Sequence, residues 1–186
     1  MKFKKTLSVA VGVILLSAAG YMYADGRTTI SEIEAMSVTH KSLDELENRS
    51  ELIVSGEPIA SENHFITDEE GFVEEGFTIT SFKIDSIYAN KSNKTLNSGE
   101  IIKVSEPVYT VDNGIKPGKT QFTIEGYELM KKSGRYLLVL RPDLTYPDLY
   151  VIVGVNEGKY RLDVSEKSVA GTGKFKNELI SKYNIR

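Results

Sequence analysis

The sequence predicts a mainly β domain, a small curled antiparallel sheet or barrel with short flanking helices, preceded by one N-terminal hydrophobic helix. Three observations support this fold class. An uncharged, largely apolar segment spans residues 6–24, directly after a short basic end. From residue 51 onward, short runs alternate apolar and polar residues with the period of two that is typical of strands. Glycine- and proline-containing turn segments separate these runs, as they do in small β folds.

The N-terminal end, residues 1–24, is predicted to be a signal peptide or a signal anchor. Its uncharged run is longer than the apolar region of most cleaved signals and close to the roughly 20 residues of a spanning helix, so both alternatives stay open. Lysines on the short side place the rest of the chain outside the cytoplasm. We therefore predict an extracytoplasmic protein, anchored in the cell membrane through residues 6–24 or secreted after cleavage. Residues 25–41 would form a stalk or linker and residues 42–186 the β domain.

Composition excludes several classes of protein. The chain has no cysteine, which excludes a disulfide scaffold, a thiolate metal site, a cysteine nucleophile and a lipid-modified cysteine. The first 24 residues hold three lysines and no acid, which leaves 20 basic and 26 acidic side chains in the remainder. A nucleic-acid-binding protein normally presents a basic face, so no nucleic-acid partner is predicted. No cofactor is predicted either.

The domain is expected to begin with a short helix. Ser42 and Glu45 have the spacing of a capping box, in which each side chain accepts a hydrogen bond from the backbone amide of the other residue. The helix should end near Ser50. A short β-branched run follows at residues 52–56, and Pro58 limits that strand to an edge or an end of the sheet.

An acidic, glycine-containing connection, residues 67–76, precedes the longest predicted strand. That strand spans residues 77–88, and its apolar alternation slips by one position near Thr80, which indicates a bulge. Long bulged strands are typical of small curled barrels. Further strands are predicted at residues 100–105 and 121–124.

Two unbroken apolar runs, residues 136–140 and 149–153, are predicted to be central strands that are buried on both faces. Residues 159–164 alternate regularly after a turn, so we expect them to form a hairpin with the second of these runs. A short amphipathic helix at residues 175–183 ends the chain.

The order of these predicted elements resembles that in a group of known proteins. The capped helix, the run of residues 50–56, the long strand, and the segments 99–104 and 132–140 resemble those of uncharacterised exported proteins of Gram-positive bacteria. Their domain is similar in layout to netrin-like and OB-like small β-barrels, and the similarity spans residues 42 to about 164. Netrin-like inhibitors chelate zinc through an N-terminal cysteine that this chain lacks, so the resemblance implies a fold and no site residues.

Few residues suggest chemistry. The two histidines, His40 and His64, are expected in exposed loops, and they lack the spacing that would place two metal ligands on one helix. Asp68, Glu69 and Glu70 could collect Ca²⁺, which prefers carboxylate and carbonyl oxygens. The alternative for these acids is a solvated charge run, because they lack the ordered spacing of a Ca²⁺ loop.

Tyrosine is the one enriched aromatic residue, with ten copies and no tryptophan. A sheet face that displays several tyrosines could stack on sugars or on the side chains of a partner, although packing in the core explains them equally well. The candidate ligand-binding residues are Tyr127, Tyr136, Tyr146, Tyr150 and Tyr160.

These observations favour a non-enzymatic binding or interaction module of the cell envelope, whose partner is an envelope protein or a polysaccharide. No serine lies in a nucleophile elbow, and a loop of consecutive acids lacks the apolar pocket that raises the pKa of a catalytic acid. The alternative is a cell-envelope hydrolase that uses the acidic loop together with His64.

Overall fold

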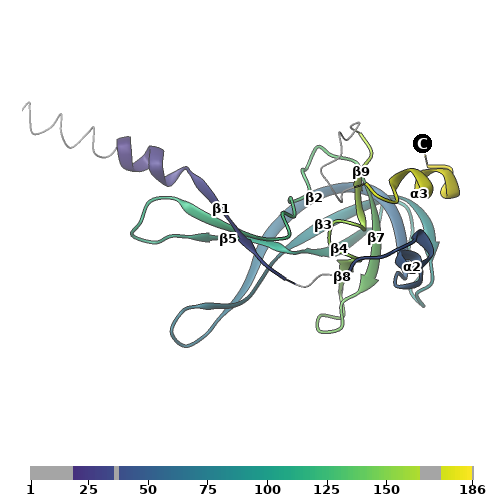
Figure 1. The fold of residues 1–186 in the computed structure, drawn as a ribbon, viewed down its shortest axis with the longest axis horizontal. Coiled ribbons are helices and arrows are strands. Elements are labelled where there is room, and N and C mark those ends of the chain that lie inside the picture. Colours follow the sequence, from purple (N-terminus) through teal and green to yellow (C-terminus); the bar gives the residue numbers. More distant parts are fainter. Residues whose placement is uncertain (1–18, 36–37, 164–172, 186) are drawn as a thin grey trace, which may run out of the picture.

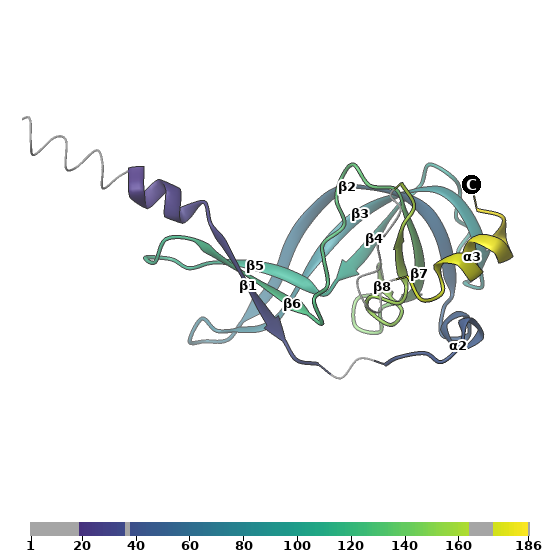
Figure 2. The ribbon, with the colours of Figure 1, turned by 45° about the horizontal axis from the view of Figure 1, so that its top comes forward.

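The computed structural model describes residues 19–35, 38–163 and 173–185 of the chain. Across these residues the fold is mainly β, as the sequence predicts, with two sheets and a few short helices. Figures 1 and 2 show helices α2 (Leu43–Asn48) and α3 (Lys176–Tyr183) gathered at one end of the larger sheet.

The larger sheet has six strands. They are β2 (Leu52–Thr67), β3 (Val73–Asn90), β4 (Ile101–Glu106), β7 (Tyr136–Pro142), β8 (Leu149–Ile152) and β9 (Lys159–Arg161), hydrogen-bonded in the order β2-β3-β4-β8-β7-β9. β2 also pairs with β7, so the pairings run from β2 through β3, β4, β8 and β7 back to β2. All are antiparallel except β4 with β8, which corrects the expected antiparallel sheet. Five strands in a circuit cannot alternate in direction all the way round, so one parallel pair is required.

β2 and β3 are much longer than the other strands. The sequence predicts a short edge strand at residues 52–56, but β2 continues through Pro58 to Thr67. Pro58 lies beyond the pairing of β2 with β7, which stops at Gly56, so its missing amide interrupts no ladder with that neighbour. β3 confirms the long strand predicted at residues 77–88 and extends it at both ends.

The bulge that we predicted near Thr80 lies in the partner strand. The register of β2 and β3 shifts between Pro58 and Ala60, so the extra residue is Ile59 of β2. β3 keeps an unbroken buried face there because Thr78 and Thr80 are buried polar residues, which the apolar pattern does not reveal. Four register shifts occur along the β2–β3 ladder, in keeping with its strong curvature.

The core has two parts, one on each face of β2 and β7. Leu52 and Val54 belong to the first cluster, whereas Ile53 belongs to the second. Residues 136–140 of β7 are all buried and alternate between the clusters in the same way. This confirms the prediction that the run is a central strand covered on both faces. Buried residues of α2 and α3 complete the second cluster.

The helix predicted at residues 42–50 is confirmed as α2, with Ser42 as its N-cap. The Ser42 hydroxyl accepts a hydrogen bond from the amide of Glu45 at 3.3 Å, as expected for a capping box. The Glu45 carboxylate accepts from the amide of Lys41 at 2.7 Å rather than from that of Ser42. The second hydrogen bond of the capping box therefore comes from the amide of Lys41, one residue before the N-cap.

The smaller sheet has three strands, β1 (Thr28–Ile33), β5 (Val108–Asp112) and β6 (Lys119–Ile124), in the order β1-β6-β5. β1 lies within residues 25–41, the predicted linker, and pairs in parallel with β6 along its whole length. Nearly all of β1 is exposed. A strand with both faces exposed has no apolar period, which is why the sequence does not indicate it.

Residues 19–25, which include the last six residues of the predicted export segment, are helical. The greater part of that segment, residues 1–18, lies outside the described residues. None of the helices in the described part of the chain is long and apolar enough to cross a membrane. Export and membrane contact therefore stay predictions.

The hairpin predicted between residues 149–153 and 159–164 is wrong. β8 pairs with β4 and β7, whereas β9 pairs with β7 alone. Gly154 and Val155 follow β8 with φ values of 67° and 52°, and this turn leads the chain away from β8. The helix predicted at residues 175–183 is confirmed as α3.

Candidate functional site

Four of the five candidate tyrosines lie in the core. Tyr127, Tyr136 and Tyr150 belong to the first cluster and Tyr160 to the second, and none is more than 6% exposed. A phenol can be buried when its hydroxyl has a hydrogen-bond partner inside the protein. The Tyr160 hydroxyl, for example, donates to the backbone carbonyl of Glu157. Of the five, only the half-buried Tyr146 is placed to meet a ligand.

Tyr146 belongs to an aromatic cluster on β2 and β3. His64, expected in a loop, lies in β2 directly opposite Phe77 of β3, and the centroids of the two rings are 4.7 Å apart. Tyr146, from the loop between β7 and β8, lies 5.7 Å from the His64 ring and 5.5 Å from the Phe77 ring. Its hydroxyl donates to the Glu75 carboxylate at 3.2 Å. The fold thus joins three rings from separate segments, which we call the aromatic cluster.

The surroundings of Tyr146 raise its pKa above the usual value for a phenol, chiefly through desolvation and then through the charge of Glu75. Glu75→Gln removes that charge, so we expect the pKa of Tyr146 to fall toward the usual value. Ultraviolet difference titration against Tyr146→Phe isolates this phenol among the ten tyrosines. An unchanged midpoint in the Glu75→Gln protein would contradict the assigned contact.

The acidic connection forms the turn between β2 and β3. Asp68 Oδ1 accepts hydrogen bonds from the amides of Glu70 at 3.0 Å and Phe72 at 2.7 Å, and Gly71 has a φ of 87°. The Asp68 carboxylate therefore holds the turn. Glu69 and Glu70 are exposed beside it, and the described residues contain no group of three or more acidic, histidine or cysteine side chains that could hold a metal ion. The three candidate Ca²⁺ ligands are not assembled into one site.

The turn ends a projecting element that exposes apolar side chains. We call residues 60–78, the distal parts of β2 and β3 with their turn, the acidic ribbon; it points away from α2 and α3 (Figures 1 and 2). Phe65, Ile66 and Phe72 expose 46%, 44% and 68% of their surface. The ribbon also carries six carboxylates and no lysine or arginine. Large apolar side chains exposed on a projecting element make it a candidate interaction site.

The hydrolase alternative requires His64 to be positioned by an acid. Nε2 of His64 is buried and has no hydrogen-bond partner, so no carboxylate orients this nitrogen. The candidate acid Glu70 donates its backbone amide to the turn, and its side chain is exposed. The geometry of these two residues therefore gives the hydrolase no support.

The other histidine, His40, is 2% exposed and not the exposed loop residue that we expected. Its backbone amide and its Nδ1 lie 2.9 and 2.7 Å from the same carboxylate oxygen of Glu157. Lys174 donates to the carbonyl oxygen of His40. These contacts join the segment before α2 to the turn after β8 and to the segment before α3, so His40 is part of the fold's internal structure.

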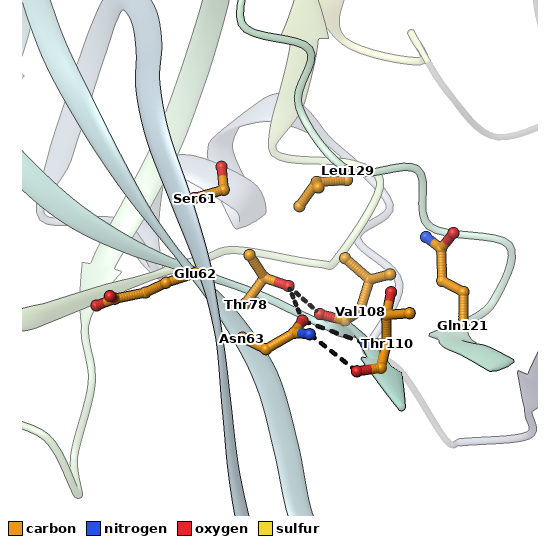
Figure 3. A pocket seen from close by; sticks show the side chains of 8 residues that line it. All are labelled: Ser61, Glu62, Asn63, Thr78, Val108, Thr110, Gln121 and Leu129. Carbon is orange, nitrogen blue, oxygen red and sulfur yellow. Dashed lines mark hydrogen bonds between the residues drawn. The ribbon is translucent and has the colours of Figure 1, made fainter. Parts of the chain in front are cut away.

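A pocket of about 210 Å³ lies where the acidic ribbon meets β5 and β6 (Figure 3). The Asn63 side chain crosses this contact: its nitrogen donates to the Thr110 carbonyl at 2.8 Å, and its oxygen accepts from the Thr110 amide at 3.2 Å. The Thr78 hydroxyl donates to the Val108 carbonyl at 2.5 Å. The pocket is smaller than the roughly 300–1,000 Å³ of typical ligand sites. We therefore interpret this pocket as part of the contact between the two sheets, which we call the joint, and not as a ligand site.

A fully buried carboxylate, Glu106, lies close to this joint. Its Oε1 accepts from the Thr80 hydroxyl, and its Oε2 accepts from the Tyr127 hydroxyl at 2.8 Å and the Met130 amide at 2.9 Å. Burial, followed by the charge of Glu106, raises the pKa of Tyr127 well above its usual value, so the phenol keeps its proton and remains a donor. These hydrogen bonds link the segment before β7 to strands β3 and β4, next to the end of the acidic ribbon.

No protein-family model, curated protein or solved structure matches this chain. The functional assignment therefore rests on the acidic ribbon and the aromatic cluster. The sequence indicated Tyr146, His64 and the acids of the turn, but it did not indicate the exposed Phe65 and Phe72. The acids that flank these phenylalanines were the available signal, because charged residues often keep exposed apolar strands soluble.

Proposed function

We propose that this chain is an exported binding module of the cell envelope, tethered to the membrane or secreted, that binds an envelope protein or a polysaccharide without converting it. The acidic ribbon and the aromatic cluster form its binding surface. The sequence of residues 1–24 supports the proposal of export, and the side chains on the ribbon support that of binding.

The finer fold that we propose is an OB-like barrel. The circuit of β2, β3, β4, β8 and β7, with its single parallel pair, supports this assignment, since an OB fold is a five-stranded, partly open barrel. Such domains bind ligands on the face of their second and third strands, between the loops that follow the first and fourth strands. The corresponding loops here are the turn of the acidic ribbon and the loop that carries Tyr146.

The exposed apolar surface of the acidic ribbon is the observation that carries the proposal. Phe72 is 68% exposed on a projecting turn, where it contributes nothing to the core. Burying a large apolar side chain against a partner is worth about 1.5–3 kcal/mol. Ile66 lies two residues after His64 and so shares its strand face, whereas Phe65 lies on the other face, so apolar contacts for an interface are available on both faces of the ribbon.

A photo-crosslinking residue at Phe72 tests the proposal in cells of the organism that produces the chain. We expect illumination of cells carrying p-benzoylphenylalanine at position 72 of the full chain to give a discrete adduct. Lys94 provides the control position, because it is exposed in the loop between β3 and β4, outside the acidic ribbon. No adduct is expected from position 94.

Two results would overturn the proposal. One is the absence of an adduct from position 72, or equal adducts from positions 72 and 94. The other is hydrolysis of peptidoglycan, peptide or ester substrates by the purified chain with loss of activity in His64→Ala, which would establish the hydrolase instead. Export is checked separately, because protease added to intact cells should degrade an extracytoplasmic domain and spare a cytoplasmic one.

A further inference from the structure

Among the described residues, the acidic ribbon has strand edges that form no ladder with a third strand, although the Asn63 side chain contacts β5, and it also has exposed apolar side chains. The pairing of β2 with β7 ends at Gly56, and that of β3 with β4 begins at Thr78. Within the described residues, the parts of β2 and β3 in the ribbon beyond these points form ladders only with each other. Such edges offer rows of backbone amides and carbonyls that an added strand can pair with.

The charge of the ribbon decides what kind of partner fits these edges. A second copy of the ribbon would bring six carboxylates against six others, and like charges in paired strands repel. Anionic polymers and anionic lipid surfaces are disfavoured for the same reason. A neutral polysaccharide offers hydroxyl donors to the carboxylates, but it has no positive charge and no backbone groups that pair with a strand edge. A basic polypeptide is the one partner among these that pairs with both the charges and the backbone edge.

We propose that the acidic ribbon binds an extended, basic and apolar segment of a partner polypeptide, which adds a strand to a free edge of the ribbon. The inference rests on the proposed function and specifies its partner. Lysine or arginine side chains of the segment pair with the ribbon carboxylates, and its apolar side chains cover Phe65 and Phe72. Backbone hydrogen bonds supply affinity, while the two kinds of side chain supply selectivity.

Synthetic peptides test this chemistry without the natural partner. The probe is a fluorescent ten-residue peptide that alternates lysine with phenylalanine, titrated by anisotropy into the full chain in phosphatidylcholine nanodiscs, with empty nanodiscs as the blank. Two matched peptides replace every phenylalanine with serine, or every lysine with glutamate. We expect the first probe to bind at least tenfold more tightly than the serine peptide, the glutamate peptide not to bind, and added salt to weaken binding.

Matched variants locate the binding surface. The triple variant Glu69→Gln, Glu70→Gln and Glu74→Gln neutralises three exposed acids of the ribbon, and we expect it to weaken binding roughly tenfold. The control variant changes the net charge equally, at three exposed acids elsewhere, and should weaken binding less than twofold: Glu34→Gln, Glu51→Gln and Glu128→Gln.

The apolar contribution has its own pair of variants. Phe72→Ser should weaken binding of the lysine–phenylalanine peptide severalfold. Ile115→Ser changes a side chain that is 97% exposed outside the ribbon, and it should leave binding unchanged. Because both residues lie on exposed turns, neither change is expected to unfold the protein.

Each contrary result overturns the inference in a recognisable way. Equal loss in the two triple variants would show that only net charge matters, and equal binding of the serine peptide would exclude an apolar contribution. A crosslinked adduct from Phe72 that survives complete proteolysis would identify a polysaccharide, which refutes this inference and leaves the proposed function standing. Absence of any adduct from Phe72 would instead refute the proposed function.

Discussion

Glu106→Leu should lower the free energy of unfolding by about 3–5 kcal/mol. Glu106 is fully buried and accepts hydrogen bonds from Thr80, Tyr127 and Met130. Leucine would leave these three donors without an acceptor in a site that water does not reach. Urea unfolding followed by circular dichroism measures the loss as a lower midpoint at an unchanged slope.

Glu106→Gln is the matched variant, and it should cost only about 1 kcal/mol. The amide oxygen can replace Oε2 as acceptor for Tyr127 and Met130, while the amide nitrogen donates to the Thr80 hydroxyl. Thr80 can then donate to Ser61, whose hydroxyl oxygen lies 3.0 Å away. A glutamine midpoint as low as that of the leucine variant would contradict the replacement of these hydrogen bonds by the amide, and an unchanged midpoint in the leucine variant would show that the network contributes little to stability.

Gly56→Ala should destabilise the fold by about 3 kcal/mol, the upper end of the usual cost of overpacking. A Cβ at this position would lie 2.0 Å from the backbone carbonyl oxygen of Lys83 and 2.8 Å from the Phe82 ring. Gly56 is also where the register of β2 and β3 shifts and where the pairing with β7 ends. A backbone atom cannot give way as a flexible side chain can, so the strands must separate locally.

Gly71→Ala separates the effect of close packing from that of backbone conformation. Gly71 has a φ of 87°, but a Cβ there would meet no atom within 4 Å. Only the conformational cost of about 1–2 kcal/mol applies. Thermal unfolding should therefore show a drop of about 6–12 °C for Gly56→Ala and a smaller one for Gly71→Ala. Equal drops would refute the role of close approach at Gly56.

Features set by neighbouring residues could be predicted from the sequence. The capping hydrogen bond of Ser42 depends on a residue three positions away, and the burial of residues 136–140 on both faces follows from an unbroken apolar run. β9 was assigned to the wrong neighbour because spacing defines a strand but not its partner. β1 was missed because it is exposed on both faces.

The site was harder to predict because its determinants are distant in sequence. The tyrosines are candidates for a binding face in the sequence, but burial of a phenol depends on acceptors such as Glu106, which lies 21 positions from Tyr127. His40 is buried through Glu157, which is 117 positions away. Similarly, Tyr146 and Glu75 lie 71 positions apart, so their contact in the aromatic cluster is visible only in the folded chain.

The parallel pairing of β1 with β6 has a mechanical consequence. Thr28 lies at one end of this ladder beside Lys119, while at the other end Ile33 lies beside Ile124, whose carbonyl accepts from the amide of the buried Tyr127. Tension on the chain before Thr28 is therefore opposed from the far end of β6. The ladder is loaded in shear, so its hydrogen bonds resist together rather than opening one at a time. A domain pulled from its N-terminal side would hold until the whole ladder slips.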